Sequence, residues 1–151
     1  MRVNFPRFAR LALVAALTLG AGGCGSATGP QPDFGVARAR WAQRAPASYT
    51  MVVIRSCECL PGAAGAVLVS VRNGVVESRA YQPSGTAVVP EYAALFPDVQ
   101  GLFALIDAAI RNGTHPLEAR YHPALGFPTR VALGDPAVDA PLYVVSEFRP
   151  R

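Results

Sequence analysis

The chain has 151 residues, of which 51% are hydrophobic and 16% charged, and its mean hydropathy is +0.25. This apolar composition excludes an intrinsically disordered chain, and the length predicts one domain rather than several. The formal net charge is +4, but three of the fourteen basic residues, Arg2, Arg7 and Arg10, lie in a targeting segment, which leaves eleven basic against ten acidic residues. No nucleic-acid partner is expected, because binding one requires a basic face.

Residues 1–23 have the order of a secretory signal peptide. A basic start precedes the apolar run Leu11–Leu19, which is followed by the small residues Gly20–Gly23. The run is shorter than the roughly 20 residues that span a bilayer. Cys24 comes next, and Leu19–Cys24 resembles a bacterial lipobox, with Ala21 where Leu is usual. We therefore expect cleavage before Cys24 and acylation of that cysteine, for example with palmitate, as a membrane anchor.

Behind this cysteine, residues 24–32 form a short tether rich in Gly, Ser and Pro, and residues 33–151 form the single folded domain. An inner-membrane retention signal is not evident, because Gly25 follows Cys24 where an acidic residue would signal retention. The expected location is the cell envelope, at the outer membrane, facing the periplasm or the cell surface.

The folded part begins with a helix and a buried strand. Apolar residues at helical spacing predict a helix over Phe34–Ala45, capped by Asp33 and ended by Pro46. Ser48–Cys59 is rich in β-branched and aromatic residues and apolar on both faces, which predicts a central strand.

A hairpin follows, with Asn73-Gly74 as a two-residue turn between Ala66–Arg72 and Val75–Tyr81. An unbroken ladder from this turn pairs Arg72 with Val75 and Val71 with Val76. It continues with Ser70 opposite Glu77, Val69 opposite Ser78 and Leu68 opposite Arg79. In that register Val69, Val71 and Ala80 share one face, and Glu77 and Arg79 share the other.

A Pro-rich connection over residues 82–97, with one helical turn near Glu91–Leu95, leads to a helix that Asp98 caps. Val99, Leu102, Phe103, Ile106 and Ile110 form the apolar stripe of this helix. Three short strands complete the chain, over Leu117–His122, Thr129–Leu133 and Leu142–Phe148. The order α-β-β-β-α-β-β-β with short links predicts an α+β domain of two layers, an antiparallel sheet with the helices on one face.

Cys57 and Cys59 are the two thiols that remain if Cys24 is lipidated. Four interpretations stay open: a structural disulfide, free buried thiols, a soft-metal or redox site, and pairing with another chain. A regular strand holds residues i and i+2 too far apart for a bridge, so a disulfide requires a turn or bulge there, and Pro61-Gly62 permits one. Reduced, the pair could hold Cu(I) or Zn²⁺, with Arg55, His115 or His122 as accessory contacts.

Five groups of residues in this domain resemble a family of bacterial, mostly lipoprotein, sequences known as domain of unknown function 6174. They are Trp41 with Tyr49, Cys57-Glu58-Cys59, Val71-Arg72-Asn73-Gly74, Leu102-Phe103, and Tyr121 with Gly126-Phe127-Pro128. His122 departs from the pattern, because an acidic residue is expected after the Tyr. The resemblance covers nearly the whole domain and implies a fold and a location, but no substrate.

The sequence lacks a phosphate-binding glycine loop, a G-x-S-x-G elbow, an H-E-x-x-H motif and a dinucleotide fingerprint. We therefore expect no catalytic residues and no resident cofactor. The leading hypothesis is a lipid-anchored, non-enzymatic module of the cell envelope that binds an envelope protein or another envelope component through one exposed sheet face. The alternative is a soft-metal or thiol-redox protein centred on Cys57 and Cys59.

Overall fold

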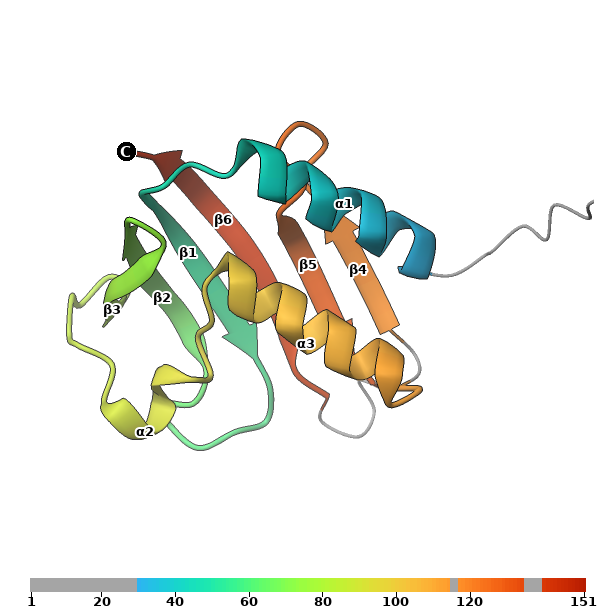
Figure 1. The fold of residues 1–151 in the computed structure, drawn as a ribbon. Coiled ribbons are helices and arrows are strands. Elements are labelled where there is room, and N and C mark those ends of the chain that lie inside the picture. Colours follow the sequence, from blue (N-terminus) through green and yellow to red (C-terminus); the bar gives the residue numbers. More distant parts are fainter. Residues whose placement is uncertain (1–29, 115–116, 135–139) are drawn as a thin grey trace, which may run out of the picture.

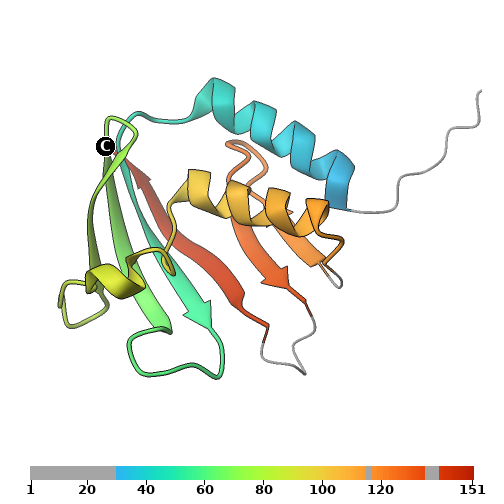
Figure 2. The ribbon, with the colours of Figure 1, turned by 60° about the horizontal axis from the view of Figure 1, so that its bottom comes forward.

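The computed structural model describes residues 30–114, 117–134 and 140–151 (Figure 1). Six strands form one antiparallel sheet in the order β3-β2-β1-β6-β5-β4, and the two long helices, α1 and α3, lie on one face of it (Figure 2). The elements are α1 (Pro30–Arg44), β1 (Tyr49–Ser56), β2 (Gly65–Arg72), β3 (Val75–Tyr81), α2 (Pro90–Ala93), α3 (Val99–Arg111), β4 (Leu117–Tyr121), β5 (Pro128–Leu133) and β6 (Leu142–Pro150). The predicted fold class and element order are confirmed, and the short α2 lies where one helical turn was predicted. The first helix begins at Pro30 instead of Phe34, so Asp33 lies inside its first turn and does not cap it.

Strand β1 lies inside the sheet, as its two apolar faces predicted, because β2 pairs with one of its edges and β6 with the other. Residues 49–53 are all buried. The strand ends at Ser56 instead of Cys59. The chain turns away there, and the cysteines lie in the loop between β1 and β2.

The core lies between the sheet and the two helices. Asp98 caps α3 by accepting the Gly101 N–H at 2.9 Å, so the predicted cap is confirmed. The apolar stripe of α3 is buried at Val99, Leu102, Phe103 and Ile106. Among the described residues, no helix is both long enough and apolar enough to cross a membrane.

An aromatic cluster attaches α1 to the sheet. Trp41 on α1 is 2% exposed, and its ring lies edge-on to Tyr49, Phe127 and Phe148 at centroid distances of 5.7, 6.0 and 5.9 Å. Phe127 and Phe148 stack on each other at 4.4 Å. These contacts hold the first helix against the two strands that flank the middle of the sheet, β1 and β6, and against the loop before β5.

The predicted hairpin turn is confirmed, whereas part of the predicted register is wrong. Asn73 and Gly74 have φ of 49° and 76°, as a type I′ turn requires. Beyond the first two pairs the register shifts by one residue, because a bulge at Glu77 places two residues of β3 opposite one of β2. Arg79 therefore pairs with Val69 and lies on the helix side, where its Nε donates to the Phe96 carbonyl at 2.7 Å. Ala80 moves to the opposite face.

Candidate functional site

The face of the sheet opposite α1 and α3 carries no described helix (Figures 1 and 2), and we call it the open face. Strand alternation and the pairing register define its side chains. They are Thr50, Val52 and Ile54 of β1, Ala66, Leu68 and Ser70 of β2, Ser78 and Ala80 of β3, Leu142, Val144 and Ser146 of β6, Arg130 and Ala132 of β5, and Glu118 and Arg120 of β4. None of the helices that the structure describes covers this face (Figures 1 and 2).

The middle of the open face is aliphatic. One row across the strands joins Val144, Ile54 and Ala66, and the next joins Ser146, Val52 and Leu68. Val52 is 6% exposed, so its neighbours on the same face cover it almost completely without a helix above them. The result is a closely packed centre, aliphatic apart from Ser146, with polar groups along its margins.

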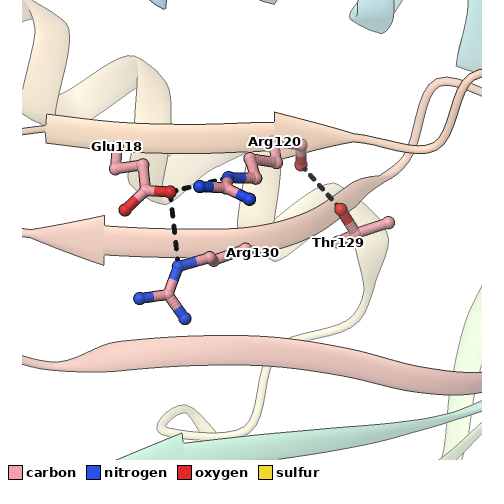
Figure 3. A network of polar contacts seen from close by, with 4 residues as sticks. All are labelled: Glu118, Arg120, Thr129 and Arg130. Carbon is pink, nitrogen blue, oxygen red and sulfur yellow. Dashed lines mark hydrogen bonds and ion pairs between the residues drawn. The ribbon is translucent and has the colours of Figure 1, made fainter.

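The margin at β4 and β5 carries a charged cluster of Glu118, Arg120 and Arg130. Glu118 Oε1 contacts Nε of Arg120 at 2.7 Å and Nε of Arg130 at 3.4 Å. In Figure 3 these side chains lie in front of the two strands, and a helix passes behind them. Register explains the meeting, because Arg120 pairs directly with Arg130 and Glu118 is two residues before Arg120 on the same face.

One carboxylate is thus shared by two guanidinium groups. Burial acts to raise the pKa of Glu118, but hydrogen bonds and charge from Arg120 and Arg130 outweigh it and hold the pKa below its usual range. Glu118 therefore stays ionised. Each arginine uses Nε for its contact with Glu118, and a guanidinium carries five N–H donors, so both can still bind a carboxylate from another molecule.

A hollow of about 390 Å³ lies between α1 and β4. Its lining includes Asp33, Arg40, Arg120 and Tyr121. The hydroxyl of Tyr121 is buried there and has no hydrogen-bond partner among the described residues. Burial, and then the negative charge of Asp33, raise the pKa of Tyr121 from 10.0 to about 12. The protonated form is thus strongly favoured in the folded protein.

We expect Tyr121→Phe to leave the free energy of unfolding at pH 8 unchanged or to raise it by about 1 kcal/mol, since it removes an unsatisfied buried hydroxyl. Because folding raises the pKa of Tyr121 above 10.0, ionisation does not affect the free energy of unfolding below pH 10 and lowers it as the pH rises towards 12. The variant should lose less stability over that interval in urea titrations.

Tyr81→Phe is the matched control for this prediction. The hydroxyl of Tyr81 donates to the Gly62 carbonyl at 2.5 Å, so its removal should cost about 1 kcal/mol. Equal destabilisation by the two variants would show that the hydroxyl of Tyr121 has a partner.

The loop between β1 and β2 holds a disulfide between Cys57 and Cys59, with their Cα atoms 5.3 Å apart. That distance lies within the normal range for a bridge and is possible because the cysteines follow the end of the strand. A ring closed over so few residues restricts the unfolded chain little, and the loop-entropy relation gives about 1.6 kcal/mol. Stabilisation of the fold is therefore a weak reason for this bridge.

Arg55, at the end of β1, is directed at the two sulfurs. Its Nη1 lies 2.7 Å from Cys57 Sγ and 3.0 Å from Cys59 Sγ. The same nitrogen donates to the Ala63 carbonyl, and Nε donates to the Tyr143 hydroxyl at 3.3 Å. The guanidinium also lies 5.9 Å from the centre of the Tyr143 ring. These contacts hold a positive charge against the disulfide on the helix side of the sheet.

His122 does not join this cluster in the described structure. His122 follows β4, whose end lies at the opposite end of the sheet from the end of β1, since the two strands run antiparallel through β6 and β5. Its Nδ1 accepts the Ala124 and Leu125 N–H groups, and its ring stacks on Phe127 at 4.8 Å. The prediction that this strand extends to His122 is wrong, because β4 ends at Tyr121 and His122 lies beyond it. His115 lies outside the described residues.

The described residues contain no complete set of metal ligands. Across residues 30–114, 117–134 and 140–151, no group of three or more His, Cys, Asp and Glu side chains could hold a metal ion. Cys57 and Cys59 would supply two ligands once reduced. Sequence reasoning singled out both cysteines and Arg55, but it did not find the cluster of Glu118, Arg120 and Arg130, whose signal was the spacing of Glu118 and Arg120 on one strand face.

Comparison with known proteins gives one result. No curated protein and no solved structure matches the chain. A family model described as a family of unknown function, DUF6174, matches residues 33–150. The match spans the described domain from the first turn of α1 to the last residue of β6. The chain therefore belongs to the DUF6174 family.

Proposed function

We propose that this chain is a non-enzymatic binding module of the bacterial cell envelope, held at a membrane by lipid on Cys24, that presents its open face to an acidic protein surface. The observation that carries the proposal is the composition of the open face. Its centre is aliphatic and no described helix covers it. At its margin Arg120 and Arg130 share the single carboxylate of Glu118.

The positive charge of Arg120 and Arg130 favours a partner that carries carboxylates. Among the described residues the cluster has one positive charge in excess and guanidinium donors that Glu118 does not occupy, so carboxylates placed around an apolar patch would complement it. Arginine is enriched in protein interfaces because its planar group binds carboxylates in two-point contacts. A nucleic acid would require many more cations than this cluster supplies. Because α1 begins at Pro30, the sequence-predicted tether is left with residues 24–29, and it would let the domain turn this face towards a neighbour.

The test reverses charge on the open face. We expect Arg120→Glu with Arg130→Glu to abolish cross-linking of the protein, in membranes of its own cells, to a defined acidic protein. Arg38→Glu with Arg111→Glu is the control, since it makes the same charge change on the two helices. If both pairs reduce the cross-link equally, net charge and not the open face is responsible, and the proposal fails.

Unfolding must be measured for each variant pair. Arg120 and Arg130 side chains are 72% and 38% exposed, and ion pairs this exposed contribute little to stability. We therefore expect both pairs to keep the melting temperature of the wild type within a few degrees, so that lost cross-linking reports lost contact.

A further inference from the structure

We infer that Cys57 and Cys59 form a redox-active disulfide that exchanges with a dithiol, and that Arg55 makes Cys57 the leaving thiolate. This site is separate from the open face, because Arg55 and Tyr143 lie on the helix side of the sheet. The proposal adds an activity to the binding role and does not depend on it.

The positive charge of Arg55 favours the reduced form of the cysteine pair. A disulfide sulfur is a weak hydrogen-bond acceptor, whereas a thiolate is an anion. The Arg55 guanidinium therefore interacts more strongly with the reduced pair than with the oxidised pair. Stabilising the reduced form raises the reduction potential and makes the disulfide a better oxidant. Cys57 Sγ is the nearer sulfur, at 2.7 Å from Nη1 against 3.0 Å for Cys59 Sγ, so the negative charge is best placed there.

The loop between β1 and β2 holds the Arg55 guanidinium and the two sulfurs together. The Tyr81 hydroxyl donates to the Gly62 carbonyl at 2.5 Å, and Ala63 N–H donates to the Leu60 carbonyl at 3.0 Å. Gly62 has a φ of 91°, and a side chain there would lie 2.9 Å from the ring of Tyr92. The charge is thus positioned before any substrate arrives, so little reorganisation is needed when the bond breaks.

An incoming thiol can reach the disulfide from solvent. Both cysteines are half-buried, and the loop projects beyond the end of β1. Leu60 immediately follows the second cysteine and is 72% exposed. An exposed apolar side chain beside a reachable disulfide gives an incoming peptide a contact next to the reacting sulfur.

The exchange takes two displacements. A thiolate of the dithiol attacks Cys59 Sγ, the Cys57–Cys59 bond breaks, and its electron pair leaves on Cys57 Sγ beside Arg55. The second thiol, after losing its proton, attacks the sulfur of the substrate in the mixed disulfide and releases Cys59 as a thiolate. Two electrons pass from the dithiol to the two cysteines, the proton of the second thiol passes to the Cys59 thiolate, Cys57 stays a thiolate beside Arg55, and the dithiol leaves as a disulfide.

The test uses the full chain in the form that cells export, purified in detergent. It measures the equilibrium between the disulfide and the reduced cysteines in buffers that differ in their ratio of reduced to oxidised glutathione. Alkylation and mass spectrometry give the fraction reduced. We expect Arg55→Gln to lower the equilibrium constant for reduction at least tenfold, about 30 mV, and Arg55→Lys to restore part of it. Arg79→Gln is the control, because Arg79 also lies on the helix side but donates to the Phe96 carbonyl, and it should leave the constant unchanged.

A second measurement needs no variant. The pH dependence of Cys57 alkylation in the reduced wild type should give a pKa at least one unit below the ordinary thiol value of about 8.5. A pKa at or above that value, or equal constants for wild type and Arg55→Gln, would overturn the proposal. Stoichiometric Cu(I) binding by the reduced protein without exchange with glutathione would overturn it as well.

Discussion

Replacing Gly126 with alanine is expected to destabilise the domain by about 3 kcal/mol or more. Gly126 has a φ of 84°, in the left-handed region that disfavours any residue with a Cβ. An added Cβ would lie 2.3 Å from the Ala37 carbonyl oxygen and 3.1 Å from the Trp41 backbone nitrogen. Both atoms belong to the backbone of α1, so the helix itself must move, and Trp41 with it.

Gly113→Ala is the control that separates the cost of backbone strain at positive φ from the cost of a steric clash with α1. Gly113 has a φ of 64°, and an added Cβ would meet nothing within 4 Å among the described residues. Its replacement should cost about 1 kcal/mol. Chemical unfolding of the two variants measures the difference directly. Equal losses would mean that α1 does not approach the loop before β5 as closely as the structure places it.

Replacing Cys24 with alanine is expected to remove the acyl mass and to release or mislocalise the protein. Each buried methylene contributes about 0.8 kcal/mol to membrane binding, and two or more chains are needed for a stable anchor. In this proposal the lipid on Cys24 is what attaches the protein to the membrane. Fractionation of cells and the mass of the N-terminal peptide give the result.

Ser26→Ala, two residues away in the tether, is the control for this substitution and should keep the acylated N-terminus and the membrane fraction. A wild-type protein without acyl mass, together with a Cys24→Ala variant in the same membrane fraction, would remove the lipid anchor from the account. The folded domain would still stand as described, because it begins beyond the tether.

Local patterns in the sequence predicted most of the fold. The Asn73-Gly74 turn, the Asp98 cap and the apolar stripe of α3 are each set by contacts within a few residues. Strand β1 was placed inside the sheet because both of its faces are apolar. These features needed no knowledge of which distant segments meet.

The errors arose where one residue interrupts a regular ladder. Glu77 forms the bulge in β3, and Glu147, with a φ of 51°, lies where β6 shifts register against β1. Neither residue is a glycine that would have marked a bulge, so strict alternation put Arg79 and Ala80 on the wrong faces. The later bulge also explains why Phe148 reaches the aromatic cluster.

The candidate sites depended on distant pairing to different degrees. Cys57 and Cys59 are neighbours in sequence, so the spacing alone singled them out. Arg130 meets Glu118 only because β5 pairs with β4 in one particular register. Arg55 was predicted only as an accessory contact of the cysteine pair, and its position against the sulfurs required the loop to fold back over it.

The most direct test of the binding role is site-specific photo-cross-linking in living cells. A photoreactive amino acid replaces Val144, in the centre of the open face, or Val36, which is 59% exposed on α1. The account predicts a cross-link to one acidic protein from position 144, none from position 36, and its loss in the Arg120→Glu/Arg130→Glu variant. Equal cross-linking from both positions, or a cross-link from position 144 that survives the charge reversal, would contradict it.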